Sequence, residues 1–332
     1  MPMRGWAELD GRRLAPEEVV RMVSTGDPRA ARLGGEFCVA KGEWRARDRQ
    51  GILPCDCRPG SIQHDGVCVG RIEPAVPDLP LAGAVERAVA LRADEGAVAF
   101  SGGLDSALVA ALARRPCVVV GIAGSHDLAR ARHAATHLDL DLEEVEIPPA
   151  RVEEALRAVL PAIPDPNPVD TAIAATLYFV AEWAAGSGHG RILGGQGADE
   201  LFGGYARYRD GGDPAVLLAR DAASLPGQVA RDQAVAGLFG CAFSMPYLDL
   251  AVVRAARALD PSTLVRGRLS KSPLRDAAAA WVPPDIALYP KKAMQYGSGI
   301  SRELRRLARH NGYKNSVRGY LTTLERTNDH GR

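Results

Sequence analysis

Two glycine-rich segments carry the residues of this sequence best suited to chemistry. The first, Ser101-Gly102-Gly103-Leu104-Asp105-Ser106, lies between an apolar run and a helix-like pattern. A strand that ends in glycines and then starts a helix directs free backbone N–H groups at one point, which suits a polyphosphate. Ser101 and Ser106 can donate to phosphate oxygens, and Asp105 then makes sense as a Mg²⁺ ligand. We predict that this loop binds a nucleotide, the alternative being a tight turn before a capped helix.

The second segment repeats this design. Arg191-Ile192-Leu193 is typical of a short strand, the glycine loop Gly194-Gly195-Gln196-Gly197 follows, and Asp199 and Glu200 lie at the start of a helix. In an open parallel sheet, ligands bind beyond the carboxyl ends of the strands, so the two loops can face one pocket from neighbouring strands. We therefore expect Asp105 and Asp199 to share a metal ion.

Both segments resemble the synthetase domain of the asparagine synthetases, members of the PP-loop ATP pyrophosphatase group. The family pattern Ser-Gly-Gly-Leu-Asp-Ser, followed by Gly-Glu-Gly-Ser/Ala-Asp-Glu-Leu-Phe-Gly-Gly-Tyr, is matched nearly residue for residue at 101–106 and 195–205. The resemblance extends over about residues 82–300. Within it, 245–249 is similar to the family's Pro-Phe-Leu-Asp turn and 271–278 to its Lys-x-x-Leu-Arg-Glu-Ala helix.

This resemblance implies an ATP- and Mg²⁺-dependent ligase that activates a small-molecule carboxylate as its acyl-adenylate. Aspartate is the default substrate, and ammonia then displaces AMP, as in asparagine biosynthesis. The resemblance maps a catalytic lysine to Lys292, with Lys291 the competing choice, and adds Gln196 and Glu200 to the catalytic set. The nucleotide is expected to contact Phe100, Ser101, Gly102, Gly103, Asp105, Ser106, Val120, Ile122, Gly194 and Gly195.

The sequence departs from the family pattern at two places. Gln196 replaces a glutamate thought to assist the amine step, and a glutamine can orient a nucleophile but cannot accept its proton. Either another group takes the proton, Glu200 being the nearest candidate in sequence, or the acceptor is not ammonia, or the reaction stops at adenylation. In addition, residues 241–244 lack the Glu and Arg that the family commonly has there, which weakens the case for aspartate.

The N-terminal region resembles part of the family's glutaminase domain. Residues 34–40 and 46–54 are similar to its Gly-Glu-Phe strand and its Arg-Asp turn, but the chain begins Met1-Pro2-Met3 and lacks the N-terminal cysteine nucleophile. We expect residues 1–80 to be a shortened, inactive remnant. Nitrogen would then come from free ammonia or from a separate glutaminase.

Composition is consistent with one sizeable α/β domain and an appendage. Of the 332 residues, 46% are hydrophobic, and 41 Lys and Arg balance 40 Asp and Glu, which gives no bulk signal for nucleic-acid binding. No signal peptide or membrane-spanning run is present, so a cytoplasmic location is expected. We predict a doubly wound parallel sheet of the PP-loop type within 81–310, a β-rich N-terminal appendage, a helical C-terminal part and a polar tail over 311–332.

Two rival functions stay open. A PP-loop tRNA-modifying enzyme is motivated by the arginines at 302, 305, 306 and 309, for which a solvated helix face is the favoured interpretation. A nucleotide-binding subunit without turnover is motivated by Gln196 and the missing nucleophile.

Two further sets of side chains have residue types that can bind a metal ion. Cys55, Cys57, His64 and Cys68 could form a zinc site, although free thiols in a hairpin are favoured because Cys-x-Cys spacing suits structural zinc poorly. His133 and His137 have a spacing that permits metal binding, but no third ligand is near in sequence, so they are expected to be surface residues.

Overall fold

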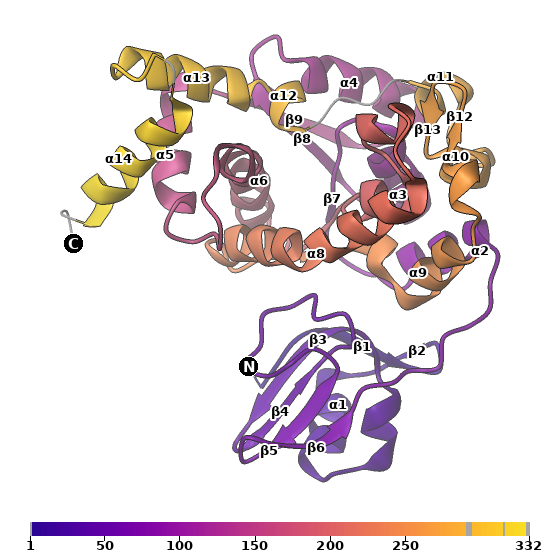
Figure 1. The fold of residues 1–332 in the computed structure, drawn as a ribbon. Helices are drawn as coiled ribbons and strands as arrows, with labels where there is room; N and C mark the ends of the chain where they lie inside the picture. The colour runs from indigo at the N-terminus through magenta and orange to yellow at the C-terminus, as the bar shows by residue number, and fades with distance from the viewer. Residues whose placement is uncertain (1, 290–293, 315, 330–332) are drawn as a thin grey trace.

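The structure, a computed structural model, describes residues 2–289, 294–314 and 316–329. It consists of a small N-terminal β-sheet part and a larger α/β part, and an extended segment between them runs along the edge of the molecule (Figure 1). The larger part begins with helix α2 at Leu81.

The N-terminal part is a six-stranded antiparallel sheet with the strand order β2-β1-β3-β4-β5-β6. Its strands are β1 (Met3–Leu9), β2 (Arg12–Arg13), β3 (Gly34–Lys41), β4 (Trp44–Arg47), β5 (Ser61–His64) and β6 (Val67–Arg71). Helix α1 (Pro16–Ser24) covers one face and buries Val19, Met22 and Val23 against a core that includes Phe37. The β-rich appendage predicted from the sequence is confirmed.

One cysteine pair in this part is joined. Cys38, on β3, forms a disulfide with Cys55, with their Cα atoms 5.6 Å apart, whereas Cys57 and Cys68 are free. The four-ligand zinc site considered for Cys55, Cys57, His64 and Cys68 is therefore wrong, because the sulfur of Cys55 is bonded to another sulfur. The expectation of free thiols holds for Cys57 and Cys68 but not for Cys55.

The larger part is built on a five-stranded parallel sheet with the order β11-β10-β7-β8-β9. Its strands are β7 (Ala97–Ala99), β8 (Cys117–Ile122), β9 (Leu142–Ile147), β10 (Arg191–Leu193) and β11 (Ala242–Ser244). The chain adds strands on one side of β7 and then returns to add β10 and β11 on the other, so the predicted doubly wound fold is confirmed. All six residues of β8 are buried, as both faces of a parallel sheet require.

Helices cover both faces of this sheet and extend beyond it (Figure 1). They are α2 (Leu81–Ala90), α3 (Leu104–Ala113), α4 (His126–Leu138), α5 (Pro149–Val159), α6 (Pro168–Gly186), α7 (Ala198–Phe202), α8 (Pro214–Gly237), α9 (Leu250–Arg257), α10 (Ser272–Ala278), α11 (Pro284–Ala287), α12 (Met294–Gly297), α13 (Ile300–His310) and α14 (Val317–Asp329). A two-stranded hairpin, β12 (Val265–Arg266) and β13 (Leu269–Ser270), precedes α10. The predicted helical C-terminal part is confirmed.

Helix α14 occupies most of the segment expected as a polar tail. It buries Tyr320, Leu321 and Leu324 in the core of the larger part. The Tyr320 hydroxyl donates to Glu153 on α5 at 3.1 Å. The helix is amphipathic, and its apolar side chains pack inward although most of the residues around them are polar.

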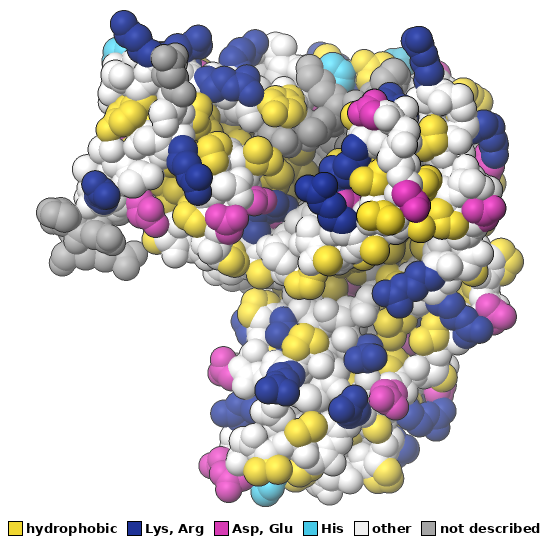
Figure 2. Space-filling view, viewed as in Figure 1, with side chains coloured by type: hydrophobic (Ala, Val, Ile, Leu, Met, Phe, Trp, Pro, Cys, Tyr) yellow, Lys and Arg dark blue, Asp and Glu magenta, His cyan; other side chains and the backbone are white. Residues whose placement is uncertain are grey.

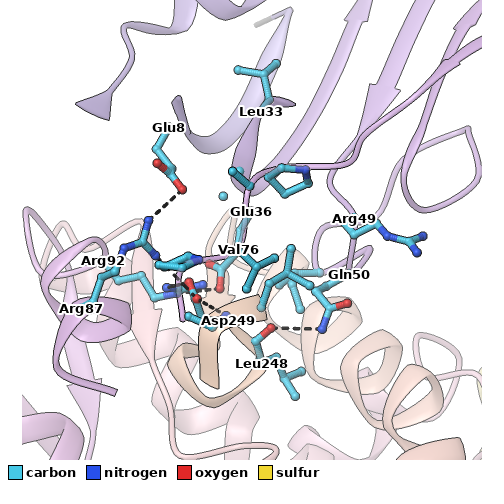
Figure 3. Close-up of a pocket in the computed structure, with 18 residues that line it drawn as sticks. Glu8, Leu33, Glu36, Arg49, Gln50, Val76, Arg87, Arg92, Leu248 and Asp249 are labelled. Carbon is cyan, nitrogen blue, oxygen red and sulfur yellow. Dashed lines mark hydrogen bonds and ion pairs between the residues drawn. The ribbon is translucent and has the colours of Figure 1, made fainter. Parts of the chain in front are cut away.

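Within the described residues, no helix is long and apolar enough to cross a membrane. The space-filling view shows the larger part hollowed on one face, with basic, acidic and hydrophobic side chains around the opening (Figure 2). The two parts meet elsewhere, where a cavity of about 30 Å³ lies between the N-terminal sheet and the turn before α9 (Figure 3). Glu36, Arg92 and Asp249 form a buried ion network there.

Candidate active site

A cavity of about 550 Å³ lies beyond the carboxyl ends of β7 and β10. These strands pair in parallel, with Ile192 opposite Ala97, so the loops that follow them are side by side. This is the switch point at which the strand order of the sheet reverses, the usual ligand position in such folds. The expectation that both glycine loops face one pocket agrees with this geometry. Of the predicted site residues, Phe100, Ser101, Gly103, Asp105, Ser106, Val120, Gly195, Gln196, Asp199 and Glu200 line the cavity.

Three predicted residues do not line the cavity, and a fourth is not among the described residues. Gly102 has φ +72°, and a Cβ atom there would come within 2.6 Å of the Arg130 carbonyl oxygen, so this glycine is needed for the turn itself. The N–H of Ile122 donates to the Ser298 carbonyl at 2.9 Å, and neither Ile122 nor Gly194 lines the cavity. Lys292 lies outside the described residues.

The first glycine loop is held in shape by its own side chains. The Ser101 N–H donates to the Ser106 hydroxyl oxygen at 3.2 Å, and that hydroxyl donates to the Gly103 carbonyl at 3.2 Å. Helix α3 starts directly after Gly103 without a side-chain cap. Its first N–H groups are therefore available to an anion, which is the arrangement that binds phosphate at helix N-termini.

The carboxylates of Asp105 and Asp199 are brought together by Lys271. The Lys271 Nζ atom lies 2.5 Å from Asp105 Oδ2 and 2.7 Å from Asp199 Oδ1. Lys271 is only 3% exposed, and burial lowers its pKa while the charge of Asp105 acts to raise it. From the sequence, Lys271 is only the first residue of a family-like helix, and no local signal places it in the site.

The same carboxylates fit a hard metal ion such as Mg²⁺. Asp105 Oδ1 is buried and has no hydrogen-bond partner among the described residues, so one ligand oxygen is left for a cation. Carboxylate oxygens are the ligands that Mg²⁺ prefers in proteins. The two loops are also in close contact, because a Cβ atom on Gly195 would lie 3.0 Å from the Asp105 Cβ.

Glu200 is buried at the wall of the cavity and already accepts hydrogen bonds. The Tyr205 hydroxyl donates to its Oε1 atom, and Gln228 Nε2 donates to the same atom at 2.9 Å. Burial, followed by the charge of Glu200, raises the pKa of Tyr205. Among the described residues, the carboxylate is thus fixed by two neutral donors, and its charge also acts to raise the pKa of Lys271.

A second buried carboxylate, Asp232 on α8, lies beside Gln196 and was missed by the sequence analysis. It accepts a hydrogen bond of 2.8 Å from Arg231 Nε, and the Arg231 guanidinium also pairs with Asp170. Burial raises the pKa of Asp232, while Arg231 and a hydrogen bond with Gln196 act in the opposite direction. No sequence motif marks this residue, because its role depends on how α8 crosses the second glycine loop.

Comparison with known proteins shows similarity to one family of ligases. The family model described as "Asparagine synthase" matches residues 80–234 and 214–323. A putative glutamine-hydrolysing asparagine synthetase of Methanocaldococcus jannaschii is 31% identical over 70% of this chain and 51% of that protein. Asparagine synthetase B of Escherichia coli is 24% identical over 61% of this chain and 41% of its own length.

A relative whose name gives a different activity matches more of the chain. Carboxyethyl-arginine beta-lactam-synthase of Streptomyces clavuligerus is 28% identical over 93% of this chain and 58% of its own length. The chain thus spans about half the length of the curated relatives that it matches.

Proposed function

Because the chain belongs to the asparagine synthase family, we propose that it activates a carboxylate with ATP as an acyl-adenylate and transfers the acyl group to an amine. One observation carries this proposal. The two glycine loops meet at the switch point of the sheet, and Asp105 and Asp199 converge there on one Lys271 ammonium. This places cationic charge and free helix N–H groups at one end of a cavity large enough for a nucleotide.

In this proposal the triphosphate lies along the first glycine loop and the N-terminus of α3. Asp105 and Asp199 would hold Mg²⁺, which when bound offsets the charge of the triphosphate and of the leaving pyrophosphate. Phe100 and Val120, which line the cavity beside the loop, would contact the base. Ser101 would donate to phosphate, whereas the Ser106 hydroxyl keeps the loop folded.

The adenylation step also needs a cation beside the oxygens of the attacked α-phosphate. Lys292 is proposed for this role from the family resemblance. Lys292→Ala should abolish pyrophosphate release while ATP binding stays largely intact, because the charge is required chiefly in the transition state. Lys291→Ala is the matched control and should keep most of the activity. The reverse result would move the assignment to Lys291.

The amine step requires a proton acceptor, which Gln196 cannot be. Glu200 is the nearest candidate in sequence, but among the described residues it accepts from Tyr205 and Gln228, whereas Asp232 is the carboxylate that hydrogen-bonds with Gln196. Asp232 borders the cavity next to Gln196, and burial raises its pKa, which makes its carboxylate a stronger base than that of an ordinary aspartate. We therefore assign the proton acceptor to Asp232, with Gln196 orienting the amine.

The proposed default reaction is the amidation of aspartate with ammonia. The test is pyrophosphate release from ATP and Mg²⁺ with aspartate, with and without ammonium, while asparagine is followed in parallel. Asparagine formed only with ammonium would support the proposal, and glutamine should not replace ammonium if the N-terminal part is an inactive remnant. Pyrophosphate without asparagine would mean that another amine is the acceptor.

A second candidate is formation of a lactam, in which the amine belongs to the activated molecule itself. It is favoured by the match of the beta-lactam-synthase over 93% of this chain and by Gln196 in place of the glutamate. An amino acid with an internal secondary amine should then give AMP, pyrophosphate and a product lighter by one water. ATP binding without pyrophosphate from any of these substrates would instead favour a non-catalytic nucleotide-binding subunit.

A further inference from the structure

Three potential metal ligands from two helices converge outside the proposed active site. His133 and His137 lie on successive turns of α4, and Asp285 lies on α11. One ligand atom from each residue can be chosen so that all three lie within 4.8 Å of one another. His133 Nε2 is in direct contact with Asp285 Oδ2 at 3.0 Å, and two ligands of a tetrahedral ion with bonds of about 2.0–2.1 Å lie only slightly farther apart, at about 3.3 Å. We propose that His133, His137 and Asp285 bind a divalent transition-metal ion of the Zn²⁺ class.

The hydrogen bonds of the two imidazoles suit this role. His137 Nδ1 lies 2.9 Å from the His133 carbonyl oxygen, and because a carbonyl only accepts, this nitrogen must carry the proton. In the neutral ring the lone pair is then on Nε2, which is left for a metal. A backbone acceptor that fixes the tautomer in this way is typical of metal-bound histidines.

The position of Asp285 is fixed by contacts that leave its carboxylate to the histidines. Arg130 Nη2 donates to the backbone carbonyl of Asp285 at 3.2 Å, not to its side chain. The Arg130 guanidinium also stacks on the Tyr289 ring, 3.9 Å from its centre, and the Tyr289 hydroxyl lies 3.0 Å from His126 Nε2. Helix α11 is therefore already seated on α4, and only the exposed side chains need to adjust around an ion.

The ligand set indicates the class of metal. Two imidazoles and one carboxylate favour Zn²⁺, Co²⁺, Ni²⁺ or Cu²⁺, whereas Mg²⁺ prefers oxygen ligands such as Asp105 and Asp199. All three side chains are exposed, so water can complete the coordination. Arg130 and Tyr289 line the large cavity, so an ion here would hold α4 and α11 together at one wall of that cavity.

The test is titration of the untagged full chain with Zn²⁺ by calorimetry, with millimolar Mg²⁺ present to occupy the carboxylate site. We expect one equivalent to bind, and His137→Ala to weaken that binding at least about tenfold. Asp285→Asn should weaken the binding less than His137→Ala does, because the amide oxygen is still a ligand, although a poorer one than a carboxylate. His310→Ala, which changes an exposed histidine on α13, is the matched control and should leave it unchanged.

Two further measurements test whether the two histidines are the ligands. Cu²⁺ bound to the chain should give an electron paramagnetic resonance spectrum with coupling to two imidazole nitrogens, and His133→Ala should remove one of them. Zn²⁺ should raise the melting temperature of the parent chain but not that of the His133→Ala/His137→Ala double variant. Zn²⁺ binding that persists unchanged in the double variant would overturn the proposal and direct attention to the free thiols of Cys57 and Cys68.

Discussion

The carboxylate of Glu36, in the N-terminal sheet, accepts a hydrogen bond of 2.9 Å from the backbone N–H of Met245 in the larger part of the molecule. It also accepts one of 2.9 Å from Arg92 Nε, and Glu36 is 3% exposed (Figure 3). Met245 starts the turn that carries Tyr247, whose hydroxyl donates to the Asp105 carbonyl at 3.0 Å. The N-terminal sheet thus supports the proposed nucleotide loop through one buried carboxylate.

Glu36→Ala should therefore lower the free energy of unfolding by about 3–5 kcal/mol, because Arg92 loses a buried partner and the Met245 N–H loses its acceptor. Urea denaturation at fixed pH measures this loss. Asp276→Ala is the control, since it removes an ion pair with Arg266 in which both side chains are more than half exposed, and it should cost under about 1 kcal/mol. Similar losses in the two variants would contradict the assigned role of Glu36.

Replacement of Lys271 tests whether Asp105 and Asp199 form a metal site. If they do, removing the Lys271 ammonium should leave their negative charge to be neutralised by the metal ion alone. In Lys271→Met, Asp105 and Asp199 lose their shared cation, so Mg²⁺ should raise the melting temperature of this variant more than that of the parent chain. Pyrophosphate release should fall about 100-fold or more.

Thermal unfolding with and without Mg²⁺, read beside the pyrophosphate assay, provides the measurement for Lys271. The control, Lys41→Met, changes an exposed lysine in the N-terminal sheet. An equal response to Mg²⁺ in the Lys271 variant and the parent chain would mean that Asp105 and Asp199 do not form the metal site.

The sheet of the larger part could be predicted because its signals are local. The apolar run of β8 and the glycine loops after β7 and β10 are each visible in a few residues, and the rule for parallel sheets then places the loops together. What could not be predicted depends on residues distant in sequence. Lys271 reaches Asp105 across 166 residues, and Asp285 reaches His133 across 152.

Distance in sequence also explains why the disulfide of Cys38 and Cys55 could not be predicted. The spacing of Cys55 and Cys57 says nothing of Cys38, which lies on β3, whereas Cys55 lies in the loop after β4. The two cysteines meet because β3 pairs with β4 and the Cys55 sulfur lies 3.6 Å from the Ala46 carbonyl oxygen of β4. Residues 311–332 were expected to be a polar tail for a different reason, namely that polar residues outnumber apolar ones there. Tyr320, Leu321 and Leu324 are few among polar neighbours, yet they fall on one face of α14.

Asp232→Asn should separate the two proposed half-reactions. The amide product should form about 100-fold or more slowly, because the asparagine cannot accept a proton, while pyrophosphate release should persist. Since burial raises the pKa of Asp232, product formation in the parent chain should rise with pH through a range above that of an ordinary aspartate. The variant should lose this dependence.

The matched control for Asp232 is Asp221→Asn. Asp221 is also a buried carboxylate on α8, but it accepts from the Tyr208 hydroxyl at 2.7 Å and does not line the cavity. It should affect stability without changing the ratio of amide to pyrophosphate. If Glu200→Gln, and not Asp232→Asn, abolished the amide, Glu200 would be the proton acceptor.

Asp48 in the N-terminal part should make stability depend on pH. Its carboxylate accepts hydrogen bonds from the Phe37 and Ile52 N–H groups at 3.3 and 3.2 Å, yet burial, assisted by the charge of Glu36, raises its pKa to about 7. The unfolded chain releases this proton near pH 4, whereas the folded chain keeps it to about pH 7. The stabilising contribution is therefore complete below about pH 4 and is lost as the pH rises to about 7.

Asp48→Asn keeps an oxygen acceptor but cannot ionise, so it should escape this loss. Between about pH 4 and pH 8, the free energy of unfolding of the variant should gain about 3–4 kcal/mol relative to the parent chain. Urea denaturation across this pH range measures the difference, with the exposed Asp56→Asn as a variant that should follow the parent chain at every pH. A constant difference between Asp48→Asn and the parent chain would show that folding does not raise the pKa of Asp48.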